Sequence, residues 1–429
     1  MWPPDDPDDR DERPVTRILL VNALPLAGVL LLDWNVAALV VLYWLEVGVV
    51  LWWALAVAPF AERPSAYPEE QAISGAFRYR RGGVSIPRTG LEIRVHNLPV
   101  VAIGAAGFGL AWLVLALLTV GFLGNSPSAA RLTEPERLLS LAAFGMVTFA
   151  SHGASTLSTY VFDRRYRECS AQEPVKAAVF PLMAIGTIVA VVGPAVEATG
   201  SGLPLLVGIV FAKFLVDLVI AYWDRIRGFD AKTGGWLGVS DDDSPAWDSG
   251  PLEDVPSRPD VTIRPRRLGV VIDGTARGFS TGVAAFALLV AVVLLALGAS
   301  ASILLIVALS LGLVAVVGLV DRSLRYWWME YRIHEADGGN GRGCLVVFDR
   351  LLGEPQWRLE PRHLASAIRE SSRVDRLLGT TTIAVELARQ ERTIRLAHLT
   401  ESDARRVLEA FGGSEETDAS RADAAARSG

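Results

Sequence analysis

The chain has 429 residues, of which 51% are hydrophobic, with a mean hydropathy of +0.34 and a formal net charge of -6 at pH 7. This composition excludes an ordinary soluble protein, and the negative charge argues against a nucleic-acid partner. Only three of the 41 basic residues are Lys, against 47 acidic residues, a balance that suits a salt-loving, haloarchaeal source with high-GC DNA.

An acidic, Pro-rich leader covers residues 1–14, and we expect it to be disordered. Eight apolar stretches follow, each close to the ~20 residues that a helix needs to cross a ~30 Å hydrocarbon core. The first is the weakest, and whether it crosses fully stays open; since the second follows at once, we expect a helical hairpin rather than a cleaved signal peptide. The stretches are residues 15–32, 34–60, 98–124, 139–162, 175–196, 203–223, 279–297 and 302–320.

Arginine is concentrated in the leader and in the connections after the second, fourth and sixth stretches. The other four connections contain only Arg131 and Arg137. Because cytoplasmic loops of membrane proteins carry an excess of Lys and Arg, this pattern orients the spans and places both termini in the cytoplasm. The sequence therefore predicts a multi-pass protein of the cell membrane.

The first six stretches form a predicted six-helix membrane domain, residues 15–227, that contains three extended motifs. They are NALPLAGVLLLDWNVAALVVLYWLE, FASHGASTLSTYVFDRRYRE and FAKFLVDLVIAYWDR. In combination these motifs resemble a family of polytopic archaeal and bacterial membrane proteins known only as a domain of unknown function. The third stretch departs from that pattern, because GAAGFGLAW lacks a His-containing aromatic motif. The resemblance implies a fold and no chemistry.

Five polar residues inside these stretches form the candidate functional site: Glu46, His152, Ser155, Lys213 and Asp217. Charged side chains near the bilayer centre cost about 2.5 to 3.5 kcal/mol each, so they usually face a partner or water. Packing is the alternative role. Lys213 and Asp217, four residues apart, would neutralise each other on one helical face, and His152 and Ser155 would make interhelical hydrogen bonds worth only ~0.6 kcal/mol each. Glu46 has no such partner on its own helix.

Residues 228–277 are predicted to be a flexible acidic linker, because the run DDDSPAWDSGPLEDVPSRPD is rich in Pro, Gly, Ser and acids. Its acidic spacing lacks the EF-hand pattern, so we expect no metal, and nothing in the chain indicates a cofactor. A two-helix membrane hairpin is predicted at 278–322 and a disordered tail at 413–429. Cys169 and Cys344 indicate neither a disulfide framework nor a metal site.

The region 323–412 changes to short segments in which apolar and polar residues alternate. Alternation at 331–335, 344–352, 355–361, 381–388 and 392–398 predicts antiparallel strands, and helical spacing at 401–411 predicts a closing amphipathic helix. The fold class is therefore a membrane all-α bundle of about eight transmembrane helices plus a small cytoplasmic α+β domain.

The segments WWMEYRI, LVVFDRLLG and RVDRLLGTTTIAVEL, followed by the terminal helix, resemble a bacterial pleckstrin-homology-like (PH-like) module. Modules of that kind directly follow a two-helix membrane hairpin. The insert ADGGNGRGC departs from their tighter first turn. The resemblance implies a cytoplasmic split barrel held against the membrane, without catalytic residues.

These features favour a membrane-anchored scaffold or binding protein that lies in the lipid bilayer and has no enzymatic activity. Residues 331–412 contain thirteen Arg against twelve acids, which is no basic face for anionic lipids, so a cytoplasmic protein partner is expected at the PH-like domain. The alternative is an ion- or proton-coupled transporter or channel that uses Glu46, His152, Lys213 and Asp217. An intramembrane enzyme is disfavoured, since His152 and Ser155 share one helix without a third orienting group. The oligomeric state stays open.

Overall fold

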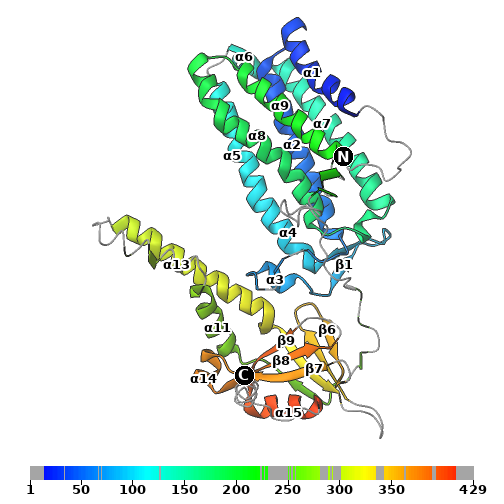
Figure 1. Ribbon diagram of the computed structural model, residues 1–429, viewed down its shortest axis with the longest axis vertical. Coiled ribbons are helices and arrows are strands. Elements are labelled where there is room, and N and C mark those ends of the chain that lie inside the picture. Colours follow the sequence, from blue (N-terminus) through cyan, green and yellow to red (C-terminus); the bar gives the residue numbers. More distant parts are fainter. Residues whose placement is uncertain are drawn as a thin grey trace. The chain divides into compact units, whose positions relative to one another are not determined.

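The computed structural model divides the chain into two compact units (Figure 1). Met1–Ala66 and Gly83–Trp247 form the membrane unit, and Tyr67–Gly82 and Asp248–Gly429 form the C-terminal unit. We call Tyr67–Gly82 the strap, because both of its ends continue into the membrane unit although it belongs to the C-terminal unit. The structure describes residues 14–32, 34–65, 67–68, 70–124, 127–222, 225–226, 228–229, 250, 252, 255–256, 258–280, 288–289, 292, 301–334, 343–361, 364–388 and 393–411.

The membrane unit consists mainly of long apolar helices. They are α1 (Pro14–Leu32), α2 (Val36–Val57), α4 (Leu98–Ile103), α5 (Gly109–Leu123), α7 (Pro135–Leu157), α8 (Gln172–Thr199) and α9 (Leu203–Ala221). A π-helical turn at Gly104–Phe108 joins α4 to α5, and another at Ser158–Phe162 extends α7. Shorter elements are α6 (Pro127–Ala130) and the hairpin of β1 (Gly83–Ser85) and β2 (Glu92–Arg94).

Local signals set the ends of these helices. Asn35 caps α2, because its Oδ1 accepts a hydrogen bond from the Ala38 N–H at 2.9 Å. Pro135 opens α7 at a position where its missing N–H costs nothing. Gly200 ends α8 in the left-handed conformation, with φ 65°.

Six helices among the described residues are long and apolar enough to cross a membrane. They span Val36–Phe60, Val95–Leu123, Pro135–Phe162, Gln172–Thr199, Leu203–Ala221 and Val307–Trp327. These helices correspond to the predicted second to sixth and eighth spans. The first predicted span forms the helix α1 but is not one of the six, and the seventh, 279–297, lies largely outside the described residues.

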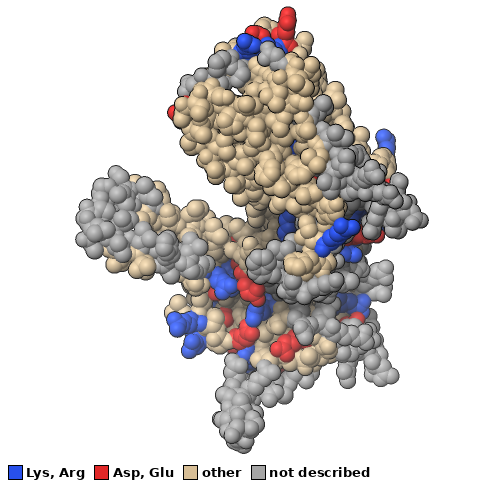
Figure 2. Space-filling view, turned by 45° about the horizontal axis from the view of Figure 1, so that its top comes forward, with Lys and Arg blue, Asp and Glu red and all other residues tan. Residues whose placement is uncertain are grey.

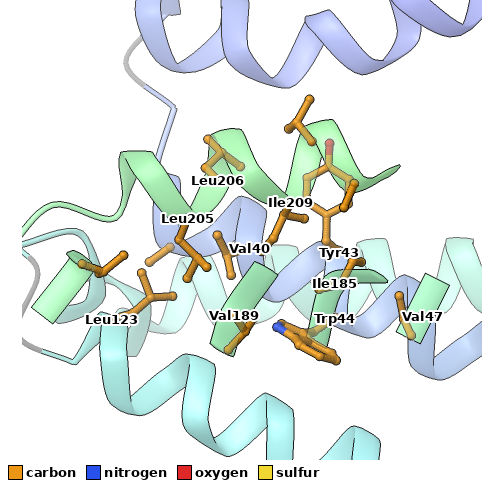
Figure 3. Close-up of a cluster of buried hydrophobic side chains, with 14 of the residues drawn as sticks. Val40, Tyr43, Trp44, Val47, Leu123, Ile185, Val189, Leu205, Leu206 and Ile209 are labelled. Atoms are coloured by element: carbon orange, nitrogen blue, oxygen red, sulfur yellow. The ribbon is translucent and has the colours of Figure 1, made fainter. Parts of the chain in front are cut away.

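The core of the membrane unit lies where α2, α5, α8 and α9 meet (Figure 3). It contains Val40, Tyr43, Trp44, Leu123, Ile185, Val189, Leu205, Leu206 and Ile209, all at most 8% exposed. The outer faces are apolar as well: Leu117 on α5 is 63% exposed and Val147 on α7 is 67% exposed. On the face drawn in Figure 2, the described surface of these helices carries few charged side chains. Such a surface suits contact with lipid.

The C-terminal unit contains two antiparallel sheets and a closing helix. The first sheet has the order β3 (Val261–Ile263), β4 (Met329–His334), β5 (Cys344–Asp349) and β6 (Glu354–Leu359); the second has β7 (Leu364–Glu370), β8 (Thr380–Leu387) and β9 (Thr393–Thr400). The helix α15 (Glu401–Phe411) contributes Val407 and Leu408 to a core that both sheets share. The predicted α+β domain, its five predicted strands and its closing helix are thus confirmed.

Three further elements differ from the sequence-based prediction. Val261–Ile263 and α11 (Arg267–Phe279) fall inside the predicted flexible linker, and β7 was not predicted. The strand β3 has only three residues and depends on pairing with β4, where Val261 lies opposite Ile333, so its own sequence carries no periodic signal. The folded unit therefore begins before the predicted hairpin.

Glycines bring α11 against α13 (Ala301–Arg322). A Cβ added at Gly274 would lie 2.7 Å from the Leu319 Cα, and one added at Gly278 would lie 2.5 Å from the Val314 carbonyl oxygen. A Cβ added at Gly318 of α13 would clash with the backbone of Gly274 and of Gly278. Contact this close is possible only without side chains, as in the small-xxx-small packing of membrane helices. The helix pair continues through the π-helical turn Ser323–Trp327 into β4.

Candidate functional site

The membrane unit brings most of the predicted site residues together. Lys213 of α9 donates a hydrogen bond from Nζ to Oε1 of Glu46 on α2, at 2.9 Å. The two side chains are 24% and 30% exposed, so the pair is half-buried. Each charge is therefore neutralised by a residue of the other helix, and neither needs a partner on its own helix.

Asp217 takes a different partner from the one predicted. Its Oδ2 accepts a hydrogen bond from Nδ2 of Asn22 on α1, at 2.9 Å. The predicted pair of Lys213 with Asp217 within α9 is therefore replaced by two contacts that each join α9 to another helix. The order of the two residues contributes to this change, because Lys213 precedes Asp217, and a basic residue four positions before an acidic one is the less favourable order on a helix.

Asn22 was missed by sequence reasoning. It is 3% exposed and lies on α1, the weakest of the predicted spans. The available signal was one amide in the apolar run LLVNALPL, since a polar side chain buried in a membrane helix requires a partner on a neighbouring helix.

His152 and Ser155 lie on α7, and only His152 joins this cluster. Its ring is partly buried, and the charges of Glu46 and Lys213 both act on it. Ser155 is exposed, so the polar face predicted on α7 is only partly directed at the cluster. We call Asn22, Glu46, His152, Lys213 and Asp217 the intramembrane cluster.

A second polar network, centred on His398 of β9, lies in the C-terminal unit. The imidazole is 3% exposed, and its Nδ1 lies 2.9 Å from Oδ1 of Asp375 on α14 (Arg373–Leu378). On the other side, Nε2 lies 3.8 Å from Oδ2 of Asp273 on α11, and that carboxylate pairs with Nε of Arg322 on α13 at 2.8 Å. These four residues form the His398 network, which joins the sheet to α11, α13 and α14.

Asp375 is held by several donors at once. It is fully buried, and it accepts hydrogen bonds from the Ser372 N–H at 3.2 Å and from the hydroxyls of Ser372 at 2.8 Å, Thr380 at 2.7 Å and Thr382 at 3.1 Å. Burial alone would raise the pKa of Asp375, but the hydrogen bonds from His398, Thr380 and Ser372 hold it well below its usual range.

The two carboxylates keep His398 charged at neutral pH. Burial alone would lower the pKa of His398, but Asp273 and Asp375 raise it from 6.5 to about 9. The backbone of His398 also has a positive φ of 54°, which is uncommon outside Gly. Such conformations persist only where surrounding contacts hold them, and they concentrate at functional sites.

A cavity of about 710 Å³ lies beside this network within the C-terminal unit. Its walls come from both sheets, from α11 and α13, and from the strap. Aromatic and Arg side chains are prominent among the lining residues, which include Tyr79, Tyr326, Tyr331, Trp357, Arg80, Arg277, Arg322, Arg325 and Arg395. A second cavity, of about 390 Å³ on the membrane unit, is lined by Val114, Leu117, Leu118, Gly121, Phe122 and Glu197 and by no member of the intramembrane cluster.

The hydroxyl groups near His398 already take part in hydrogen bonds. The neighbouring hydroxyls of Ser372, Thr380 and Thr382 donate to Asp375 and are therefore not aligned for activation by His398. Within the residues that the structure describes, no group of three or more His, Cys, Asp or Glu is arranged to hold a metal ion.

Sequence reasoning missed this network, although one signal for it was present. Ser372 and Asp375 have the spacing of a helix capping box, and the structure shows both of its reciprocal hydrogen bonds. That motif would have marked the start of α14 and a buried carboxylate. The position of His398 opposite it depends on the pairing of β8 with β9, which local sequence does not encode.

Comparison with known proteins covers the first half of the chain. A model described as a family of unknown function, DUF6498, matches residues 5–233. No curated protein and no solved structure matches the chain. All members of the intramembrane cluster lie inside the matched range, and the His398 network lies beyond it.

Proposed function

The chain belongs to DUF6498, a family of unknown function, and we propose that it is a membrane-anchored scaffold whose C-terminal unit binds a protein partner. Membership agrees with the motifs of the first six spans. The match itself assigns no activity, so the proposal depends on the geometry of the two units.

The cavity of the C-terminal unit carries this proposal. It is about 710 Å³ in size and is rich in Tyr, Trp and Arg, the residue types that supply most binding energy at protein interfaces. In the membrane unit, by contrast, Lys213 pairs with Glu46 and Asp217 with Asn22. Side chains that are satisfied in this way favour structural packing over ion transport.

Within the C-terminal unit, residues 323–412 are proposed to form a PH-like split barrel without enzymatic activity. The four-stranded and three-stranded antiparallel sheets, followed by α15, support that assignment. The hydroxyls of Ser372, Thr380 and Thr382 all donate hydrogen bonds to Asp375, and this supports a non-enzymatic role.

Both termini and the two sheets of the C-terminal unit are proposed to be cytoplasmic. The positive-inside pattern supports this orientation, and so does the packing of the strap into the C-terminal unit, where Arg80 contacts Asp349. Thr89→Cys and Leu351→Cys should therefore react with a membrane-impermeant maleimide only after the cells are permeabilised. Labelling of one cysteine but not the other in intact cells would contradict this topology.

Partner binding is tested by filling the cavity in the full-length protein. Thr393 of β9 lines the cavity and is partly buried, so Thr393→Trp should occupy part of the space. Leu377, which is 75% exposed on α14 and outside the cavity lining, offers a matched control as Leu377→Trp. In native membranes, a chemically crosslinked partner should be recovered with wild type and Leu377→Trp and lost with Thr393→Trp. Equal recovery with all three would refute the cavity as the binding site.

The transporter alternative has one observation in its favour. The Glu46 and Lys213 side chains keep 30% and 24% of their surface exposed. Proton or ion flux into reconstituted vesicles that falls in Glu46→Gln and Asp217→Asn would favour transport. Flux equal to that of protein-free vesicles would remove the alternative.

A further inference from the structure

The strap is the one part of the family region that lies in the C-terminal unit. The family match covers residues 5–233, and the C-terminal unit contains Tyr67–Gly82 together with Asp248–Gly429. The strap follows α2 in the sequence and precedes α4, so peptide bonds connect both of its ends to membrane helices. Its contacts with the rest of the unit are specific at three places along its length.

The first place is a buried ion pair near the end of the strap. Arg80 donates from Nε to Oδ2 of Asp349 at 2.8 Å, and its terminal nitrogen lies 2.5 Å from the same oxygen. The side chains are 3% and 0% exposed. Oδ1 of Asp349 accepts from the Leu351 N–H at 2.8 Å, so both carboxylate oxygens have partners. A charge buried this deeply requires its partner, because each alone would be left without solvation.

The second place is one residue further along. Gln356 of β6 is 2% exposed, and its side-chain amide makes two hydrogen bonds with the backbone of Arg81, one as acceptor and one as donor. Oε1 accepts from the Arg81 N–H at 2.7 Å, and Nε2 donates to the Arg81 carbonyl at 3.1 Å. This reciprocal pairing resembles the addition of a strand residue to a sheet edge, and it fixes the register of the strap.

The third place lies at the other end of the strap, before α3 (Ser74–Phe77). Oδ1 of Asp321, at the end of α13, accepts from the Ile73 N–H at 2.9 Å, and Arg325 donates to the Gln71 carbonyl at 3.0 Å. Ile73 has a φ of 63°, a conformation that a β-branched residue adopts only where contacts hold it. The same residues, Asp321 and Arg325, are joined by an ion pair at 3.0 Å.

We propose that the strap is the docking element through which the family's membrane region binds the C-terminal unit of its own chain. Asp321, Asp349 and Gln356 form the receptor for this segment. The strap also supplies Gly75, Ala76, Tyr79 and Arg80 to the cavity wall, so a partner in the cavity contacts a segment that is continuous with α2 and α4. Binding in the cavity and the state of those helices are then linked, and the linkage is reciprocal. The docking stands without the partner, whereas the linkage rests on the proposed function.

Hydrogen exchange of the full-length protein in lipid nanodiscs tests the docking without any partner. The strap amides should be protected in wild type, and Arg80→Ala and Asp349→Asn should each raise their exchange rate roughly tenfold or more. Arg88→Ala removes a charge from the same connection, outside the strap, and should change nothing. Unprotected strap amides in wild type, or equal rates in wild type and both variants, would overturn the docking.

Amides of β8 report whether the unit itself stays folded in these variants. If β8 also loses protection in these variants, Gln356→Ala replaces them, because it leaves no buried charge behind. It should likewise raise the exchange rate of the strap amides. A second measurement uses Arg81→Cys with Glu354→Cys and a short bismaleimide in native membranes, because the Glu354 side chain lies beside Gly82, the residue after Arg81. The crosslink should form, and adding Arg80→Ala should lower its yield; no crosslink in the otherwise native double-cysteine protein would contradict the proposal. Failure of partner capture with a protected strap would instead refute only the linkage.

Discussion

The two units use charged side chains in different ways. In the membrane unit, Lys213 and Glu46 meet as a half-buried pair and Asp217 meets a single amide. In the C-terminal unit, Arg80 and Asp349 are almost completely buried, and His398 lies between two carboxylates that have further partners of their own. Isolated pairs neutralise charge in the membrane, whereas connected networks fix the positions of elements that are far apart in the sequence. The difference teaches that polarity inside an apolar span is weaker evidence for a functional site than a buried network around a residue with a strained backbone is.

The largest effect is expected at the buried pair. Arg80→Ala should lower the unfolding free energy of the C-terminal unit by about 3 to 5 kcal/mol, because Asp349 would remain buried without a counter-charge. Chemical denaturation of the full-length protein in detergent, followed by hydrogen exchange in β8, measures this loss. Arg376→Ala, on the exposed side of α14, should cost little. A loss below about 1 kcal/mol for Arg80→Ala would mean that this pair contributes no more to stability than an ordinary surface salt bridge does.

The intramembrane pair should respond less. Glu46→Gln leaves Lys213 without its counter-charge and should destabilise the membrane unit by about 2.5 to 3.5 kcal/mol, the approximate cost of an unpaired charge in a span. Glu46→Gln with Lys213→Met should recover most of that loss, because neither charge then remains. Resistance of the full-length protein to unfolding by detergent measures both. A double variant as unstable as the single one would show that the pair does more than neutralise charge.

The His398 network predicts a pH dependence of definite sign. The pKa of His398 is raised from 6.5 to about 9, so its contribution is fully present below pH 6.5 and is lost as the pH rises through about 9. On the order of 3 kcal/mol should be lost across this range. Thermal unfolding of the C-terminal unit, followed at both ends of the range, measures it. His398→Asn, which tolerates the positive φ, should flatten the alkaline loss; an unchanged slope would assign the dependence to other groups.

The smallest effect is expected where the helices α11 and α13 touch. Gly318→Val should cost about 1 to 3 kcal/mol by forcing the two backbones apart. Gly312 lies on the same helix with open space around it, so Gly312→Val is a matched control with little expected cost. Differential scanning calorimetry of the full-length protein compares the stability of the two variants. Equal stability of both variants would mean that close backbone approach is not needed here.

Sequence predicted those parts of the molecule that local pattern encodes. Apolar runs predicted the helices that contain Glu46 and Lys213, and alternation predicted most strands of the C-terminal unit. Pairing was harder to predict. Nothing in α9 distinguishes Asp217 as a partner for Lys213 from Asp217 as a partner for Asn22, because the choice depends on how helices pack.

The strap shows the same limit more strongly. In the sequence, Arg80 is one of several arginines that predict a cytoplasmic connection after the second span. Its partner Asp349 lies 269 positions further along the chain. The strand β3 and the position of His398 likewise depend on long-range strand pairing. Local sequence identified the elements, and tertiary structure decided which polar groups met.

One crosslinking measurement compares the two units directly. Recovery of a crosslinked partner from native membranes should be unchanged in the Glu46→Gln, Lys213→Met double variant and lost in Thr393→Trp. Loss of the partner in the membrane variant, with full recovery in Thr393→Trp, would contradict the assignment of binding to the C-terminal unit.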